Sequence, residues 1–255
     1  MKLKGQVVFV TGASAGIGEA CAYAFAAEGA NLLLAARRAE RLEAMRGRLM
    51  EAGAGAVHAF GLDVQSRAAV EQAMAALPEA WRAIEVLVNN AGLSRGLDKL
   101  HEGEVRDWEE MIDTNVKGLL YVTRAVVPGM VARGRGHVIN LGSTAGEMTY
   151  PKGAVYCATK AAEKSISEGL RQDLLGTQVR VTSVDPGMVE TDFSKVRFRG
   201  DEERAAKVYQ GLTPLRPEDV AEAIVWAATR PAHVNIGRIG MTTIDQANSL
   251  LFNRS

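Results

Sequence analysis

Residues 156–160 read YCATK and contain the two side chains best suited to acid–base chemistry. Tyr156 and Lys160 are four residues apart, so on a helix both lie on one face, one turn from each other. A phenol has an ordinary pKa of about 10 and is a poor base at neutral pH, but a lysine ammonium beside it favours the phenolate. The pair predicts a general acid and base. The alternative is that both side chains lie on a solvent-exposed helix face and have no catalytic function.

Other polar residues follow apolar runs that read as buried strands. Ser143 ends the segment HVINLGS, and residues 89–92, NNAG, end the run before it. Asn115 lies within a predicted helix that begins near Val105. Ligands of open parallel sheets bind at the carboxyl ends of the strands, so we expect the Ser143 hydroxyl to emerge at the ligand site.

A glycine-rich turn, TGASAGIG at residues 11–18, joins the first apolar run to a helical segment. Gly12 permits a tight turn, Gly16 lets backbone N–H groups approach a pyrophosphate, and Gly18 lets the helix pack closely on the strand. The helix N-terminus adds a dipole that favours an anion, so the turn predicts a dinucleotide site. A plain strand-to-helix connection is the alternative. The candidate cofactor residues of this turn are Gly12, Ser14, Gly16, Ile17 and Gly18.

The second apolar run ends in AARRAERL, where a NAD site carries an acidic residue about 20 residues after the glycines. Ala36 takes that place, and Arg37 and Arg38 follow it. Two guanidinium groups attract the 2′-phosphate of NADP, and arginine is unfavourable at a helix N-terminus without an anionic partner. The segment therefore predicts NADP as the cofactor; the alternative is that the two arginines lie on a solvated face.

Short apolar runs alternate with longer alanine-rich segments, which is the pattern of a parallel sheet covered by helices. The expected strands are residues 6–10, 31–35, 56–62, 86–89, 137–141 and 179–184, with a seventh near 238–242. The expected helices are residues 17–28, 40–51, 68–76, 105–131 and 156–175, and Pro128 is expected to end or kink the fourth. The strands are continuously apolar, as strands buried on both faces are. We expect one α/β, doubly wound domain over residues 1–255.

Residues 188–217 interrupt this pattern with mixed charge, Phe193, Phe198 and two prolines. A long insertion after the carboxyl end of a strand often closes over a ligand, so this segment is the expected substrate lid. No repeat, low-complexity stretch or linker divides the chain.

The composition excludes several classes of function. Lys and Arg number 30 against 30 Asp and Glu, with no basic tract, so there is no footprint for nucleic acid. No run approaches the roughly 18 apolar residues of a membrane span, and the apolar start leads into a glycine turn and not into an export signal. Cys21 and Cys157 are the only cysteines, which excludes a disulfide framework and favours the cytoplasm. No metal is expected, because the histidines are single and lack ligand spacing: His58, His101, His137 and His233.

The ordered set of TGASAGIG, NNAG, Asn115, Ser143, YCATK and DPG at residues 185–187 resembles the short-chain dehydrogenase/reductase family over essentially the whole length. The resemblance implies a Rossmann fold with a seven-stranded parallel sheet and hydride transfer between a nicotinamide and an alcohol or carbonyl. It implies that Tyr156 is the acid/base, that Lys160 favours its ionised form and holds the nicotinamide ribose, that Ser143 orients the substrate oxygen, and that Asn115 supports a relay water. Further implied cofactor contacts are Asp63, Val64, Asn90, Ala91, Gly92, Pro186, Gly187, Val189 and Thr191. A homotetramer is also implied.

Within the family, the segments DWEEMIDTNVKGL, GSTAG, VRFRGD and PAHVNI resemble the NADP-dependent 3-hydroxy acid dehydrogenases that oxidise serine and L-allo-threonine and reduce malonic semialdehyde. A small 3-hydroxy acid is thus the expected substrate, and its carboxylate needs a cation. The candidates are Lys152, Lys195, Arg197 and Arg199, with Lys152 and Arg197 favoured. Two alternatives remain: a reductase of another carbonyl class (ketone, sugar or 3-oxoacyl thioester), and a non-catalytic nucleotide sensor. The tail, residues 244–255, is a candidate cover for a pocket.

Overall fold

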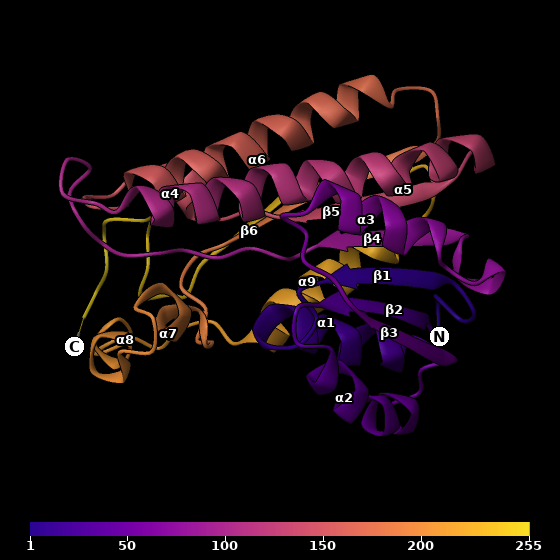
Figure 1. The fold of residues 1–255 in the computed structure, drawn as a ribbon, viewed down its shortest axis with the longest axis horizontal. Coiled ribbons are helices and arrows are strands. Elements are labelled where there is room, and N and C mark those ends of the chain that lie inside the picture. The colour runs from indigo at the N-terminus through magenta and orange to yellow at the C-terminus, as the bar shows by residue number, and fades with distance from the viewer. Residues whose placement is uncertain (255) are drawn as a thin grey trace.

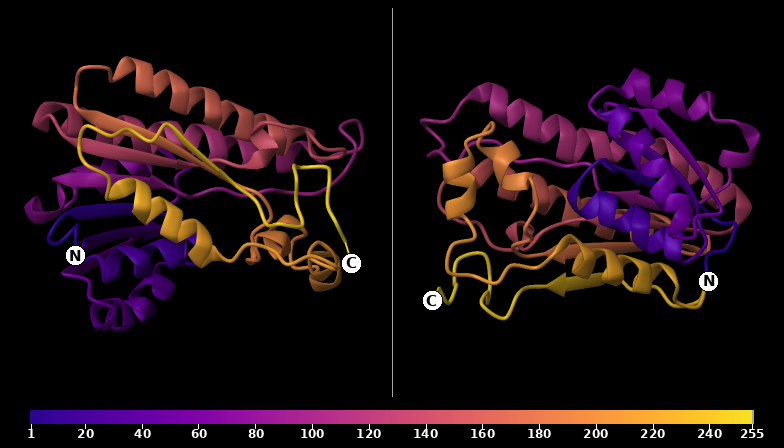
Figure 2. Two further views of the ribbon diagram at one scale, coloured as in Figure 1. Left: turned by 180° about the vertical axis from the view of Figure 1, so that it is seen from behind. Right: turned by 90° about the horizontal axis from the view of Figure 1, so that it is seen from below.

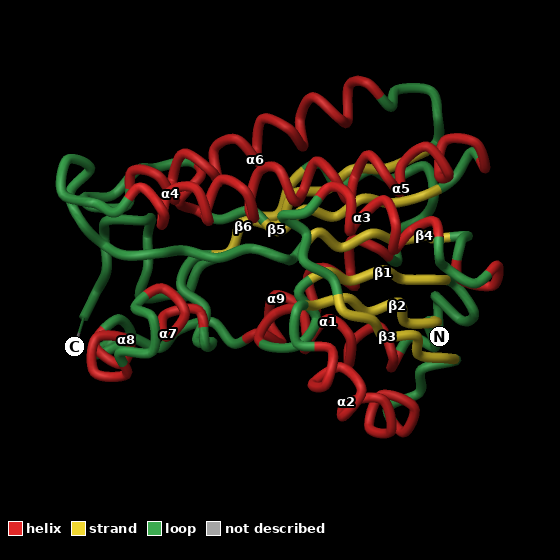
Figure 3. Tube along the Cα trace, in the orientation of Figure 1, coloured by secondary structure: helices red, strands yellow, loops and turns green. Residues whose placement is uncertain are grey.

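The computed structural model describes residues 1–254 and contains one seven-stranded sheet with helices on both faces (Figures 1 and 3). The strands are β1 (Val7–Thr11), β2 (Asn31–Ala36), β3 (Ala56–Gly61), β4 (Ile84–Asn89), β5 (Gly136–Leu141), β6 (Val179–Pro186) and β7 (Arg238–Met241). Their order is β3-β2-β1-β4-β5-β6-β7, and every neighbouring pair is parallel. The predicted α/β, doubly wound fold with seven parallel strands is confirmed.

The helices form one layer on each face of the sheet. The longer ones are α1 (Gly16–Ala27), α2 (Ala39–Glu51), α3 (Arg67–Ala75), α4 (Val105–Ile112), α5 (Leu119–Arg133), α6 (Ala154–Asp173) and α9 (Pro217–Ala228). The shorter segments are η1 (Glu79–Trp81), η2 (Asp113–Gly118), η3 (Thr144–Gly146), α7 (Phe193–Arg197) and α8 (Glu202–Lys207). In Figure 1, α3, α4, α5 and α6 lie above the sheet and α1, α2 and α9 lie below it. The views of Figure 2 agree with this two-layer arrangement.

Alternate residues of β1 supply two apolar cores, one on each face of the sheet. Val8 packs in a cluster with Phe25 of α1 and Ile224 of α9. Phe9, the next residue, packs in a second cluster with Met130 of α5. All five side chains are fully buried, which explains why this strand reads as continuously apolar.

The predicted helix over residues 105–131 is three consecutive segments. After α4, the π-helical turn η2 covers Asp113–Gly118, and α5 then runs on to Arg133. Pro128, expected to end or kink the helix, does not end it, because α5 continues to Arg133, and the kink stays a prediction. Pro128 lies on an exposed face together with Arg124, the residue whose carbonyl loses its partner, so water can replace the missing hydrogen bond.

The sequence pattern missed α9, the helix between the candidate lid and β7. Its start carries a recognisable signal, because Pro217 occupies the first turn and the Asp219 carboxylate accepts a 2.7 Å hydrogen bond from the backbone N–H of Arg216. The candidate lid itself contains α7 and α8.

Parallel pairing brings the carboxyl ends of all seven strands to one edge of the sheet, on the left in Figure 1. The order of the strands reverses between β1 and β4, the position where open α/β sheets bind ligands. Helices α7 and α8 lie at this same edge. Within residues 1–254, no helix has the length and apolar character needed to cross a membrane.

Candidate active site

A cavity of about 800 Å³ lies at the carboxyl edge of the sheet. This volume is within the range of about 300–1,000 Å³ that small-molecule and cofactor sites occupy. The residues predicted from the sequence for cofactor and catalysis line it, except Gly18 and Asn115. They are Gly12, Ser14, Gly16, Ile17, Arg37, Arg38, Asp63, Val64, Asn90, Ala91, Gly92, Ser143, Tyr156, Lys160, Pro186, Gly187, Val189 and Thr191.

The glycine turn has the backbone that its sequence predicts. Gly12 and Gly16 have φ of +65° and +56°, a region that favours glycine. A Cβ on Gly18 would lie 2.4 Å from Nδ2 of Asn90, so no larger residue fits there. Nδ2 of Asn90 donates to the carbonyl oxygens of Thr11 (2.8 Å) and Gly12 (3.2 Å). Asn90 therefore braces the turn with its side chain, a function that the sequence did not predict.

Arg37 and Arg38 lie at the beginning of α2, where both are exposed and both line the cavity. Nη2 of Arg38 donates to the hydroxyl of Ser14 over 3.2 Å. This end of the cavity thus offers two guanidinium groups and a hydroxyl to an anion, with no carboxylate in the place where a NAD site carries one. Because the glycine turn, the paired arginines and the volume all suit a 2′-phosphorylated dinucleotide, the residues present fit NADP.

Tyr156 and Lys160 lie at the other end of the cavity, on α6. Both are buried, with 9% and 6% of their surface exposed, and Nζ of Lys160 lies 5.9 Å from the centre of the Tyr156 ring. Ser143 lines the same cavity after β5, and its Oγ accepts a 3.1 Å hydrogen bond from the backbone N–H of Ala145. Since Oγ is the acceptor in that bond, the Ser143 hydroxyl proton is available to a ligand.

Lys160 has two protein partners. Its Nζ donates to the carbonyl oxygen of Leu141 (2.9 Å) and to the carboxylate of Glu163 (2.9 Å to Oε2, 3.2 Å to Oε1). The sequence analysis did not single out Glu163, although its position three residues after Lys160 on a helix is a signal that could have revealed it.

Asn115 lies in the π-helical turn η2 and is fully buried. Its Nδ2 donates to the Leu93 carbonyl (2.8 Å) and to Oγ1 of Thr159 (3.0 Å), and its Oδ1 accepts from the Leu93 N–H (2.8 Å). The side chain therefore ties the segment after β4 to α6 and does not reach the cavity. A relay water beside Lys160 stays a prediction. Single π-helical turns inside helices occur frequently at functional sites.

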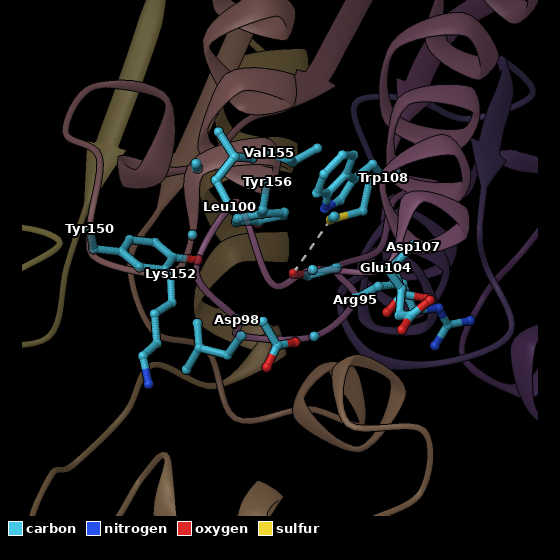
Figure 4. A pocket seen from close by; sticks show the side chains of 17 residues that line it. Arg95, Asp98, Leu100, Glu104, Asp107, Trp108, Tyr150, Lys152, Val155 and Tyr156 are labelled. Carbon is cyan, nitrogen blue, oxygen red and sulfur yellow. Dashed lines mark hydrogen bonds between the residues drawn. The ribbon is translucent and has the colours of Figure 1, made fainter.

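A second cavity, of about 30 Å³, lies on the other side of Tyr156 (Figure 4). Tyr150 and Trp108 line it together with Tyr156, and Tyr156 is a wall of both cavities. Figure 4 shows the Lys152 side chain extending away from the Tyr156 ring. Lys152 also lines this small cavity, but it is exposed and its ammonium end points away from Tyr156.

Arg197 contacts Tyr156 but lines neither of the two cavities. Its guanidinium carbon is 5.4 Å from the centre of the Tyr156 ring and 5.2 Å from that of Phe193, and Nη2 donates to the Tyr150 hydroxyl over 3.1 Å. Nε of Arg197 is buried and has no hydrogen-bond partner within residues 1–254. A buried donor left unpaired is costly, so this atom is suited to receive a ligand oxygen.

The other candidate cations have carboxylate partners. Lys195 lies 3.8 Å from Asp192 and 3.5 Å from Glu202. Arg199 forms an ion pair with Asp107 of α4. Of the four cations predicted from the sequence, Arg197 is the one that contacts Tyr156.

The candidate lid is docked on the segment before α4. The N–H of Gly96 donates to the carbonyl of Arg197 over 3.0 Å, and Arg95 bonds to the carbonyl of Val196. Arg95 also forms a two-pronged pair with Glu110, 2.7 Å at each contact. The hydrogen bond from Arg95 lowers the pKa of Glu110 below its usual range, so the pair stays charged at neutral pH.

An ionic network of one buried and two exposed side chains lies next to the loop of Ser143. The Asp185 carboxylate at the end of β6 accepts from Ser183 (2.6 Å) and from Arg238 of β7. Arg238 also pairs with Glu147, the residue that follows η3. A Cβ on Gly142 would lie 1.9 Å from Oδ1 of Asp185, so the chain before Ser143 requires glycine at this point.

The tail contacts the loop that follows β6 and lines the cavity. Oε1 of Gln246 accepts a 2.8 Å hydrogen bond from the N–H of Met188, and the Thr213 N–H donates to Asp245 over 3.0 Å. Residues 245 and 246 therefore hold both ends of the candidate lid by hydrogen bonds to its backbone. Residue 255 of the predicted tail lies outside the described residues. Within the described part of the chain, no group of three or more His, Cys, Asp or Glu side chains could hold a metal ion.

The fold and the site together define an oxidoreductase class. Residues 6–202 match the family described as short chain dehydrogenase, and the chain belongs to this family. It is 54% identical over 243 residues to the NADP-dependent 3-hydroxy acid dehydrogenase YdfG of Salmonella typhi, covering 95% of this chain and 96% of that protein.

Two further similarities bear on the site. The sulfoacetaldehyde reductase 2 of Chromohalobacter salexigens is 45% identical over 243 residues, covering 95% of this chain and 96% of that protein. A solved serine dehydrogenase in its closed form, complexed with NADP+, superposes with a TM-score of 0.92 at 48% identity, covering 98% of this chain and all of that one.

Proposed function

We propose that this chain is an NADP-dependent dehydrogenase of small 3-hydroxy acids such as L-serine and L-allo-threonine, with Tyr156 as the acid/base. The observation that carries the substrate class is the contact of Arg197 with Tyr156, because it puts a cation beside the group that would meet the substrate hydroxyl. The similar proteins named for 3-hydroxy acids and serine support the same class.

Different residues of the cavity would bind the cofactor, transfer the proton and orient the substrate oxygen. Arg37, Arg38 and the glycine turn would hold NADP, which when bound supplies the hydride acceptor. Tyr156 takes the proton of the substrate hydroxyl, and the Ser143 hydroxyl donates to the same oxygen. The ammonium of Lys160 favours the anionic form of the phenol.

The carboxylate of a 3-hydroxy acid cannot be buried without a partner, because an unpaired charge in a partly desolvated site is too costly. Nε and Nη2 of Arg197 are two donors next to the Tyr156 ring, although Arg197 itself lines neither cavity. A sulfonate presents the same oxygen anion, which is consistent with the name of the sulfoacetaldehyde reductase relative.

The test is a panel of substrates followed through NADPH absorbance, with NADP+ and NAD+ compared. L-Serine, L-allo-threonine and 3-hydroxybutyrate should be oxidised with NADP+, and malonic semialdehyde should be reduced with NADPH. If neutral ketones or sugars react and none of the acids does, the substrate belongs to another carbonyl class. Binding of NADPH with no turnover of any substrate would favour a nucleotide sensor.

We also propose that residues 188–217 act as the lid of this site, within one domain over residues 1–255. The contacts of Arg197, Val196 and Arg199 with the segment before α4 and with α4 support this, since they are the contacts that an opening movement would break. Limited proteolysis within the lid should slow when NADPH and a hydroxy acid are present. Equal cleavage rates would contradict a closing lid.

A homotetramer in the cytoplasm completes the proposal. Strand β7 is an edge strand, and Trp226 and Ile244 are exposed apolar side chains in the flanking segments, so this side offers a surface for a second copy. Cys21 and Cys157 are free and buried, which suits a reducing compartment. Light scattering should give the mass of four chains, and cell fractionation should recover the activity with cytoplasmic enzymes.

A further inference from the structure

The ammonium of Lys160 is paired inside the protein with the carboxylate of Glu163. The two side chains are 7% and 3% exposed, and the shortest distance between Nζ and the carboxylate is 2.9 Å. Since both groups are almost out of contact with water, the pair interacts more strongly than the same pair on a surface would. Lys160 thus lies near Tyr156 while its positive charge is in direct contact with the negative charge of Glu163.

The backbone of Glu163 is linked to the sheet through Ser167. Oγ of Ser167 donates to the Glu163 carbonyl over 2.7 Å and accepts a 2.8 Å hydrogen bond from Nδ2 of Asn140 on β5. This turn of α6 is therefore tied to the sheet. Lys160 in turn donates to the Leu141 carbonyl at the end of β5, so the pair bridges one helix and one strand.

The ammonium has three hydrogens to donate. Leu141 and Glu163 accept at least two of them, which leaves at most one for the cofactor ribose or the Tyr156 oxygen. Glu163 thus restricts the direction in which Lys160 can act.

Few charged groups face this pair. Tyr156 faces Lys160 from the same helix, and Asp185 faces both members from β6, with its own carboxylate bonded to Arg238. Burial raises the pKa of Glu163, and the Lys160 ammonium opposes this shift by favouring the carboxylate. Burial alone would lower the pKa of Lys160, but Glu163 and Tyr156 outweigh it and raise this pKa. Lys160 is therefore protonated at neutral pH.

We propose that Glu163 is a positioning residue for proton transfer at Tyr156: its carboxylate holds the Lys160 ammonium and offsets its charge, so that Tyr156 ionises at a higher pH than it would beside an unpaired lysine. The inference rests on the proposed function, with Tyr156 as the acid/base. Its consequence is that the usable pH range of the enzyme depends on a residue that touches neither substrate nor cofactor.

The decisive variant is Glu163→Gln, which keeps the shape and an acceptor for Lys160 but removes the charge. In alcohol oxidation the ionised phenol is the active form, so kcat/KM rises with pH through a midpoint. With the lysine charge unopposed, this midpoint should fall by about one pH unit, and oxidation below it should become up to about tenfold faster than in the wild type. Glu163→Asp keeps the charge, so its midpoint should stay near that of the wild type even if its rate falls.

A matched control is Glu168→Gln, which removes an exposed carboxylate from the same helix. It should leave the midpoint in place, because a solvated charge is screened. An unchanged midpoint in Glu163→Gln, with Tyr156→Phe inactive, would overturn this inference and leave the proposed function intact. Full activity of Tyr156→Phe would instead overturn the proposed function.

Wild-type protein and Lys160→Met provide a second test if Glu163→Gln does not fold. With 13C-labelled glutamate, the Glu163 carboxyl should titrate at a higher pH in Lys160→Met, because a buried carboxylate without its cation is disfavoured. An identical titration in the two proteins would mean that Glu163 does not interact with Lys160, and the inference would fail.

Discussion

Arg38 donates a hydrogen bond to the hydroxyl of Ser14 over 3.2 Å, and this contact joins the beginning of α2 to the glycine turn. The 2′-phosphate of NADP would bind at the point where these two elements approach each other. Arg37, one residue earlier, lines the same part of the cavity. The choice between the two nicotinamide cofactors can therefore be tested at this corner.

Replacing Arg37 with Asp should weaken NADP+ binding and relatively favour NAD+. A charge-assisted contact of about 1.5 to 3 kcal/mol becomes a repulsion, so kcat/KM for NADP+ should fall by at least tenfold. Arg41→Asp is a suitable control, because Arg41 is exposed on α2 and does not line the cavity. A wild-type preference for NAD+ under matched conditions would contradict the assignment.

Tyr156→Phe removes one hydroxyl and should lower turnover by about a hundredfold or more, the range for losing a general acid or base. NADPH should still bind, because the arginines and the glycine turn are untouched; fluorescence titration measures this. Lys160→Met should impair both turnover and cofactor affinity. A Phe variant with a near-normal kcat would exclude Tyr156 as the acid/base.

Arg197→Leu should raise KM for L-serine, L-allo-threonine and 3-hydroxybutyrate by about ten- to a hundredfold, because it removes a charge-assisted contact with the carboxylate. An uncharged secondary alcohol of similar size should be much less affected. Lys152→Met is the matched control, since Lys152 is exposed and extends away from Tyr156. Equal effects of Arg197→Leu on acids and neutral alcohols would rule out a carboxylate contact.

His137 should make the protein less stable in acid. It is 1% exposed on β5, and burial, with a smaller effect of Arg180, lowers its pKa from 6.5 to about 3. The unfolded chain binds the proton more readily, so the contribution of the neutral ring is complete above pH 6.5 and is lost as the pH falls towards 3, by about 1.4 kcal/mol per pH unit.

Urea unfolding of wild type and His137→Val at several pH values between 4 and 7.5 measures this slope. The Val variant should lose less stability per pH unit, although it also loses the 2.7 Å hydrogen bond with Thr182. His101→Asn, on an exposed side chain, should leave the slope unchanged. Parallel slopes for wild type and the Val variant would contradict the prediction.

Regular elements and glycine turns are the part of this molecule that its sequence predicts well, because each depends on local patterns. The apolar run of β1 and the turn around Gly12 are examples. The π-helical turn around Asn115 was missed, since it arises from packing between α4, α6 and the segment after β4. Side-chain partnerships across the chain, such as that of Arg197 with Tyr150, also depend on the tertiary fold and have no signal in one sequence.

Arg238 on the outermost strand pairs with Asp185 of β6 and with Glu147, and so connects that strand with the loop that carries Ser143. Any molecule that binds along β7 and changes the state of Arg238 would alter the energy of that loop. By thermodynamic reciprocity, a ligand that orders the loop must then change the affinity of β7 for that molecule by the same factor. Communication between the outer strand and the cavity would in that case need no moving domain, only a guanidinium shared between an edge of the sheet and the loop of Ser143.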